Sequence, residues 1–275
     1  MERFRVEPID QRAPVRANGS FLLPRLHVFE FTDQAWLPNT VRAIVTDAIG
    51  EAFKGCGVAS EIGKTLASMI RESGGEPEIL ELAAGSAEAS VLLVNELGAT
   101  VRYTVSDKYP DLNAFRRSCQ ITQGRLTFIE EPIDVLNIPG DLQGLRLLVM
   151  SFHHFRPEQA LRILQGAYDR RLPIAIFEFT DRRLVRTLLI GPLCVLQMLT
   201  LLPKILKEYS WRGAVGFLPA TVAYAWDGFV SCLRSYTLRE FGSMTRPLSD
   251  GYRWRMGNSR TAIPGVRLTY LLGAA

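Results

Sequence analysis

Short apolar segments alternate with helical segments through the middle of the chain. Runs of apolar and β-branched residues predict strands at residues 78–82, 101–107, 126–131, 145–152 and 173–179. Between them, apolar residues recur every three or four positions and predict helices at residues 87–97, 112–122 and 157–168. This alternation predicts an α/β fold with a mostly parallel sheet covered on both faces. Ligands of such sheets bind beyond the carboxyl ends of the strands.

The two ends of the chain follow other patterns. Residues 40–53 and 61–75 each have apolar positions at helical spacing, so residues 1–75 are predicted to form a helical cap or lid. Residues 252–258 and 266–273 alternate with a period of two, which predicts an antiparallel pair at the edge of the sheet. The main domain is therefore expected to cover residues 76–275.

An apolar region interrupts this domain at residues 184–235. Residues 184–206 and 213–230 are mostly apolar and contain Pro192, Pro203 and Pro219. The longest stretch without charge, residues 187–203, falls just short of the ~18 residues expected of a membrane-spanning helix. The favoured interpretation is a buried helical insertion after the fifth strand. Peripheral contact with a membrane and a homodimer interface are the open alternatives.

The segment EILELAAGSAEAS, residues 78–90, contains the first candidate site. It begins as a buried strand and ends as a helix, and the turn between them has only small residues around Gly85. Such a turn lets a ligand approach the backbone closely. Asp107 ends the next strand and is placed to bind ribose hydroxyls, and Asp134 follows the third strand, where a carboxylate could accept from an adenine amino group.

These motifs resemble those of the class I S-adenosylmethionine-dependent methyltransferases. ILELAAGSA is similar to the first motif of that family, with Glu81 as its acid and Gly85 as its middle glycine, although Ala83 and Ala87 replace the usual glycines. YTVSD and Asp107 match the second motif, and the final strand pair matches the reversed hairpin of the family. The resemblance implies a Rossmann-like sheet and S-adenosylmethionine as cofactor. It implies cofactor contacts by Glu81, Ala83, Gly85, Ser86, Asp107, Lys108, Asp134, Val135 and Ser151.

The fourth strand ends in VMSFHHF, which resembles the segment that passes under the reactive methyl group in this family. His153 and His154 are the candidate catalytic bases, and His154 is preferred. A core position for one and a cap for the other is the structural alternative. Trp36, Trp226 and Asp227 are candidate substrate contacts. The segment around His27, Glu30 and Trp36 is a candidate lid, and Asp227 is alternatively a helix cap.

The amino-acid composition limits the kinds of partner and the cellular location that the protein is expected to have. The chain is 47% hydrophobic and 22% charged, as expected of a folded protein, and its net charge of +4 is scattered, which argues against nucleic acid. The four cysteines form no CxxC pair and have no histidines at metal-ligand spacing, so no metal site is predicted and a reducing compartment is expected. Residues 1–16 are charged and lack an apolar run, which predicts no secretory signal. The expected location is cytoplasmic, with membrane association left open.

The predicted function is therefore methyl transfer to a small, largely hydrophobic acceptor, with S-adenosylhomocysteine as product. Two alternatives remain. The protein could use S-adenosylmethionine without transferring the methyl group, as in an intramolecular cyclisation that yields methylthioadenosine, or it could bind the cofactor without catalysis. A nicotinamide dehydrogenase is disfavoured because the chain lacks G-x-G-x-x-G.

Overall fold

The computed structural model describes residues 21–74, 77–263 and 266–275. Residues 1–16, where no secretory signal is predicted, lie outside this range, as does the start of the predicted 1–75 cap. Seven strands form one sheet in the order β3-β2-β1-β4-β5-β7-β6. The strands are β1 (Glu78–Glu81), β2 (Arg102–Val105), β3 (Leu126–Phe128), β4 (Leu145–Val149), β5 (Ile174–Glu178), β6 (Arg253–Arg260) and β7 (Arg267–Ala274).

The first five strands are parallel, and β7 reverses the direction. It pairs antiparallel with both β5 and β6, with Phe177 opposite Tyr270 in one register and Met256 opposite Leu271 in the other. All seven predicted strands and the reversed final hairpin are confirmed. The strand order reverses between β1 and β4, which pair with each other although they are far apart in sequence. This arrangement creates the topological switch point at which α/β sheets bind ligands.

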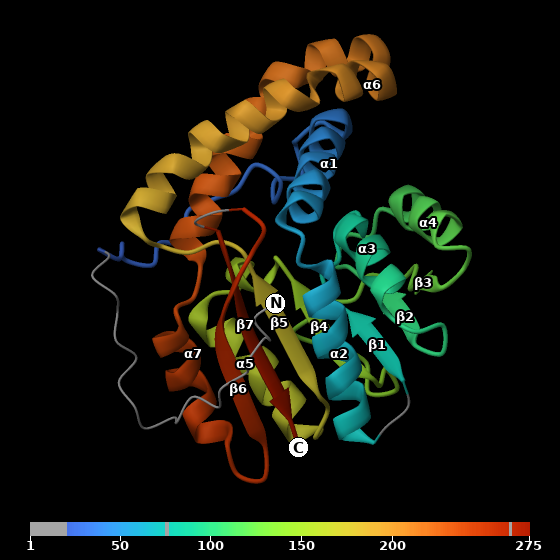
Figure 1. Ribbon diagram of the computed structural model, residues 1–275, viewed down its shortest axis with the longest axis vertical. Coiled ribbons are helices and arrows are strands. Elements are labelled where there is room, and N and C mark those ends of the chain that lie inside the picture. Colours follow the sequence, from blue (N-terminus) through green and yellow to red (C-terminus); the bar gives the residue numbers. More distant parts are fainter. Residues whose placement is uncertain (1–20, 75–76, 264–265) are drawn as a thin grey trace.

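Helices cover both faces of the sheet (Figure 1). On one face, the buried side of α2 contributes Ile62, Leu66 and Met69 to a core shared with α3 and the sheet. On the other face, α5 contributes Ala160 and Leu164 beside α7. The helices are α1 (Asn39–Cys56), α2 (Ala59–Ser73), α3 (Glu88–Glu96), α4 (Leu112–Ile121), η1 (Phe152–His154), α5 (Pro157–Asp169), α6 (Leu184–Arg234), α7 (Leu238–Thr245) and η2 (Arg246–Leu248).

Helix α6 is a hairpin of two arms that meet at Ser210, whose backbone (φ 53°, ψ −136°) is not helical. The arms run back to back above α1, at the top of Figure 1. One side of the hairpin packs on α1, where Ile44 and Ala48 meet Met198, Ala220 and other residues of α6. The other side is exposed. The prediction of a helical insertion is confirmed, but its description as buried is wrong, because only 17% of its most apolar window is buried.

The segment before α1 crosses back over the sheet. Leu23 N donates to the carbonyl of Arg182, Leu26 N donates to that of Leu233, and Leu22 forms an isolated bridge with Arg183. The Arg25 guanidinium donates to the carbonyl oxygens of Phe155 and Arg234 and lies 4.2 Å from the ring centre of Tyr236. These contacts hold residues 22–34, here called the strap, beside the loop that follows β4.

Candidate active site

The loop after β1 has an unusual backbone. Ala83, Gly85 and Ala87 all adopt left-handed conformations, with φ values of 53°, 58° and 59°. The left-handed region costs a residue with a Cβ roughly 1–2 kcal/mol, so alanines there carry strain that glycines would not. These are the three positions at which the resembling motif has glycine. The loop therefore keeps the backbone of that motif although two of its glycines are absent.

Gly85 lies at the open edge of the loop. It is exposed, and a Cβ added there would meet no atom within 4 Å. Its N–H donates to Asp107 Oδ2 at 2.9 Å, and Asp107 Oδ1 accepts from Tyr109 N at 2.8 Å. Two turns are thus tied by one carboxylate that has no cationic partner among the described residues. A carboxylate has about four acceptor positions, so Asp107 keeps capacity for further donors.

Glu81 supports this loop from below. It is buried, and its Oε2 accepts from the hydroxyl of Tyr103 on β2 at 2.6 Å. Burial raises the pKa of Glu81 to about 7, with nearby Asp107 adding to the rise and the hydrogen bond from Tyr103 opposing it. The cofactor contact of Glu81 remains a prediction. The contact that the structure shows is the hydrogen bond with Tyr103 of β2.

The third strand end presents an ion pair. Lys108 Nζ lies 2.8 Å from Asp134 Oδ2, and Leu136 N donates to Asp134 Oδ1 at 2.9 Å. The hydrogen bond from Lys108 lowers the pKa of Asp134. Val135 beside it is buried in the core. The predicted adenine contact of Asp134 would therefore have to share this carboxylate with Lys108.

Ser151 and the two histidines follow β4. The Ser151 hydroxyl is buried, and it has no hydrogen-bond partner among the described residues. The rings of His153 and His154 lie 4.4 Å apart. His153 is buried, and its Nδ1 lies 2.8 Å from Oε2 of Glu178 at the end of β5. Both imidazoles therefore lie at the carboxyl ends of β4 and β5.

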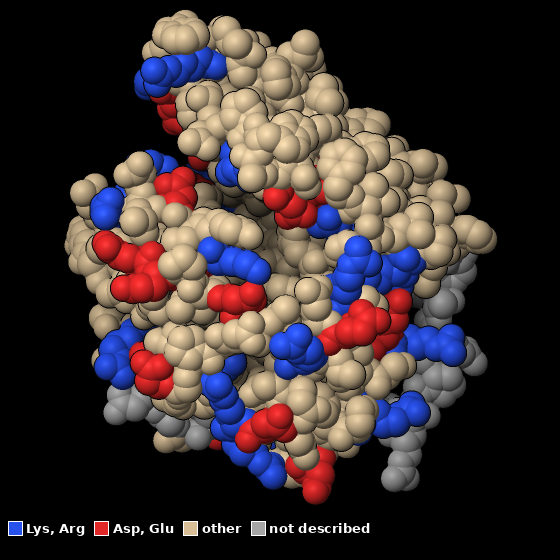
Figure 2. Space-filling model, turned by 180° about the vertical axis from the view of Figure 1, so that it is seen from behind, with Lys and Arg blue, Asp and Glu red and all other residues tan. Residues whose placement is uncertain are grey.

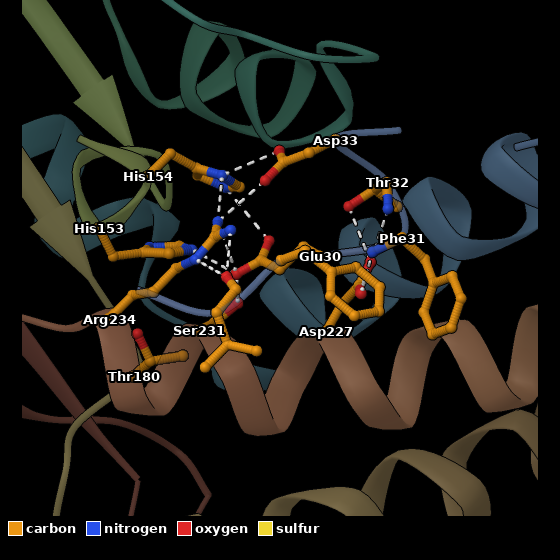
Figure 3. A network of polar contacts seen from close by, with 12 residues as sticks. Glu30, Phe31, Thr32, Asp33, His153, His154, Thr180, Asp227, Ser231 and Arg234 are labelled. Carbon is orange, nitrogen blue, oxygen red and sulfur yellow. Dashed lines mark hydrogen bonds and ion pairs between the residues drawn. The ribbon is translucent and has the colours of Figure 1, made fainter. Parts of the chain in front are cut away.

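The strap brings two carboxylates to these histidines (Figure 3). Glu30 Oε2 lies 3.6 Å from His154 Nε2, and Asp33 Oδ1 lies 3.2 Å from His154 Nδ1. Burial alone would lower the pKa of His154, but Glu30 and Asp33 raise it to about 9. Burial would raise the pKa of Asp33, but its contacts with His154 and Arg234 hold it well below its usual range. The two carboxylates thus favour the protonated form of His154, and the charge of Arg234, whose Nη1 lies 3.2 Å from His154 Nδ1, opposes it.

Arg234 at the end of α6 completes the network. Its side chain is 3% exposed, and Nη1 lies 3.2 Å from Glu30 Oε1 and 3.0 Å from Asp33 Oδ2. Its Nη2 donates to the carbonyl of Val28 at 2.6 Å. The Ser231 hydroxyl donates to Glu30 Oε1. The strap, β4, β5 and α6 therefore meet in one buried polar cluster.

This cluster contains the single group of potential metal ligands found in the described residues. Glu30, His153 and His154 each offer one ligand atom, and these atoms lie within 4.8 Å of one another. The sequence predicted no metal because the four cysteines form no CxxC pair and have no histidines at metal-ligand spacing, and it did not bring Glu30 to the two histidines. Arg234 lies against the same carboxylate and already supplies a positive charge. A metal ion at this position would therefore compete with Arg234 for Glu30.

The candidate substrate residues have other partners. Asp227 accepts from the backbone of Phe31 at 2.6 Å and of Thr32 at 2.9 Å, and also from the Thr32 hydroxyl. Because it is buried within α6 and holds the strap, the interpretation of Asp227 as a helix cap is wrong. The nearest arginine along the chain, Arg234, binds Glu30 and Asp33 instead. A direct substrate contact would compete with these bonds.

Trp226 of α6 and Trp36, which lies two residues after the strap, form an aromatic cluster with Phe29 and Phe31 of the strap. Trp226 Nε1 donates to the carbonyl of Phe29, and its ring centre lies 5.5 Å from that of Phe29. Phe31 bridges the two tryptophans, 6.0 Å from Trp36 and 6.5 Å from Trp226. Trp36 remains 65% exposed and Phe29 48% exposed. The two predicted substrate residues are thus brought together around an open aromatic surface.

Sequence reasoning missed four members of the polar cluster as site residues. Glu30, Asp33, Glu178 and Arg234 come from three separate segments, and no spacing rule connects them. Glu178 did carry a signal, because an acid inside the apolar segment PIAIFEF requires a buried partner. Arg234 carried the same signal within VSCLRSY.

The strand order, the left-handed loop and the reversed hairpin define the class I methyltransferase fold. A scan against protein-family models and a search of curated protein sequences gave no match. Among solved structures, the plantazolicin methyltransferase BpumL in complex with S-adenosylhomocysteine is similar, with a TM-score of 0.52, 13% identity, and coverage of 88% of this chain and 93% of that chain. A candidate O-methyltransferase from Nostoc punctiforme PCC 73102 has a TM-score of 0.50 and 14% identity over 92% of this chain and 64% of its own.

Proposed function

We propose that this protein is an S-adenosylmethionine-dependent methyltransferase whose acceptor is a small, largely apolar molecule. The observation that carries the proposal is the loop after β1, which has three left-handed residues and in which Gly85 N–H donates to Asp107, at the edge of a class I methyltransferase sheet. Strained backbone persists where the structure around it requires it, and such strain gathers at ligand sites.

The residues present fit the cofactor. Gly85 leaves open space where the backbone would meet the ligand, and Asp107 keeps acceptor capacity for ribose hydroxyls. The buried Ser151 hydroxyl, which has no partner among the described residues, is available to a polar group at the end of β4. When bound, S-adenosylmethionine supplies a methyl group already activated by a sulfonium. Ala83, Gly85, Ser86, Asp107, Asp134 and Ser151 would hold it.

The remaining task of the chain is to position the acceptor and exclude water. Positioning of two reactants contributes up to ~7–11 kcal/mol to a reaction of this kind. The strap is anchored by Arg25, Asp227 and Arg234, so it covers the ends of β4 and β5 as a fixed wall. Phe29 and Phe31 of the strap form an apolar aromatic surface together with Trp36 and Trp226, which favours an apolar acceptor.

An acceptor hydroxyl must also lose a proton. The sequence favoured His154 as base, but its pKa of about 9 leaves it protonated near neutral pH. His153 is better arranged, because a proton on Nδ1 is held by Glu178 and the lone pair then remains on Nε2. We assign the base to His153. The positive charge of His154 balances Glu30 and Asp33, and Glu178 is a positioning residue for His153.

Product analysis tests the proposal. Purified protein is incubated with S-adenosylmethionine and a panel of aromatic and aliphatic hydroxyl compounds, and the nucleoside products are separated by chromatography. Formation of S-adenosylhomocysteine together with a methylated acceptor supports methyl transfer. Formation of methylthioadenosine would instead favour cyclisation, and unchanged cofactor with every acceptor would indicate a binding protein without catalysis.

Substitution of the histidines sharpens this test. His153→Gln should lower kcat by about 10²–10⁴-fold, the usual contribution of a general base, with little change in cofactor affinity. Glu178→Gln should shift the pH profile of kcat, because it changes the group that orients His153. If His154→Gln has the larger effect on kcat and His153→Gln changes only stability, the assignment of the base to His153 is wrong.

A further inference from the structure

The outer side of the α6 hairpin is a continuous apolar surface. On the first arm, Val185, Leu189, Leu193, Leu196 and Leu199 are between 52% and 67% exposed, and they recur every three or four residues. A soluble core helix with this composition would be mostly buried. The most apolar 18-residue window of α6 has a mean hydropathy of 1.8, which is sufficient to cross a membrane, yet only 17% of it is buried.

The second arm continues the same surface. Trp211, Val215, Leu218 and Val222 are between 54% and 70% exposed and also follow helical spacing. Figure 2 shows the result as a tan band along the upper part of the molecule, with basic residues at its upper-left end. An apolar surface of this extent marks an interaction site in a folded protein.

Charge is confined to the ends of this surface. Residues 187–203 of the first arm and 213–226 of the second contain no Asp, Glu, Lys or Arg. At the tip, Lys207 and Arg212 are exposed, and within residues 21–74, 77–263 and 266–275 no carboxylate pairs with either. Glu208 is the one exposed acid between them and lies 4.0 Å from Lys204, so Lys207 and Arg212 are the two basic side chains of the tip that can meet phosphate groups. Exposed aromatic Trp211 lies between the two basic residues, as is common where a protein meets the lipid headgroups.

The hairpin is tied to the rest of the protein on its inner side. Gln197 Nε2 donates to the carbonyl of Ala48 at 2.8 Å, and Lys204 Nζ lies 2.7 Å from Glu51 Oε1. Tyr209 donates its hydroxyl to Asp47. A spanning orientation would break these polar contacts and bury Asp47 and Glu51 in hydrocarbon. An orientation parallel to the membrane keeps them and buries only the outer surface.

We propose that the α6 hairpin binds the surface of an anionic phospholipid membrane, with its outer apolar side among the acyl chains and its basic tip at the headgroups. Helices with one apolar side and terminal basic residues bind membranes in this orientation. A second copy packed in parallel is disfavoured as the partner, because two basic tips would then lie near each other, and an antiparallel pair is an outcome that the test below separates. The proposal is independent of the methyltransferase activity.

Vesicle flotation of the full chain tests it. Wild-type protein should float with vesicles of mixed phosphatidylcholine and phosphatidylglycerol and bind pure phosphatidylcholine more weakly. Leu193→Glu combined with Leu196→Glu should lower the bound fraction about tenfold or more, since two apolar contacts are lost and two like charges are added. Lys207→Glu combined with Arg212→Glu should remove the preference for anionic lipid. Ile121→Glu, an exposed apolar position on α4, is the matched control and should bind as wild type does.

Two measurements keep a failure of folding apart from a failure of binding. Each variant should keep the wild-type thermal transition and the same affinity for S-adenosylhomocysteine, which also separates this proposal from that of the activity. Sedimentation velocity without lipid tests the second copy. Absence of flotation by the folded wild type would overturn the proposal, as would a dimer that the Leu193→Glu, Leu196→Glu variant dissociates.

Discussion

The two halves of the candidate site are built in opposite ways. At β1–β3 the site is mostly backbone, with a strained loop, the Asp107 carboxylate held by two backbone N–H groups, and an exposed ion pair. At β4 and β5 it is a buried network of side chains from the strap, two strand ends and α6. The first half fits a ligand that is the same in every enzyme of a fold class. The second half depends on side chains from distant segments of the chain, and side chains are what the proposed choice of an acceptor would require.

Removal of Arg234 should have the largest effect. Arg234→Met leaves Glu30 and Asp33 without their buried cation, which should cost about 3–5 kcal/mol of unfolding free energy. Urea denaturation measures the loss, and Arg239→Met, an exposed arginine on α7, is the control. A cost below about 1 kcal/mol would mean that the second half of the site is not held by this network.

Glu81 gives the first half its own pH dependence. Its pKa is raised from 4.5 to about 7 in the folded protein, so the folded state binds the proton more tightly than the unfolded state. The associated stability is complete below pH 4.5 and is lost as pH rises to about 7, a change of about 3 kcal/mol. Denaturation of wild type and Glu81→Gln across this range checks the prediction. The variant should lack this decline, and equal slopes would contradict the account.

Removal of the methyl group of Ala83 should reveal the strain in the loop after β1. Ala83→Gly relieves a left-handed alanine and should raise the unfolding free energy by about 0.5–1 kcal/mol, after the larger chain entropy of glycine is subtracted. Ala89→Gly, in the regular helix α3, should lower it by about 1 kcal/mol. If both substitutions destabilise equally, the loop is not strained as described.

The difference between the halves also explains what the sequence could predict. Local patterns predicted the strands, the loop at residues 83–87 and Asp107. The hydrophobic periodicity of a strand and the position where it ends can both be recognised from a few neighbouring residues. His153 and His154 were found because they follow a strand directly. Glu30 and Arg234 lie about 200 positions apart and meet only through the strap, so no local pattern joins them. The surface of α6 was misjudged because an apolar helix has the same sequence pattern against protein or lipid.

Binding of S-adenosylhomocysteine, measured by titration calorimetry, tests the central claim most directly. The account predicts saturable binding by wild type and a loss of at least ~1 kcal/mol in Asp107→Ala, because ribose hydroxyls and Gly85 N–H lose their acceptor. Asp169→Ala, at the far end of α5, should bind as wild type does. No binding by folded wild-type protein, or equal affinity in Asp107→Ala, would contradict the assignment of this edge of the sheet as a nucleoside site.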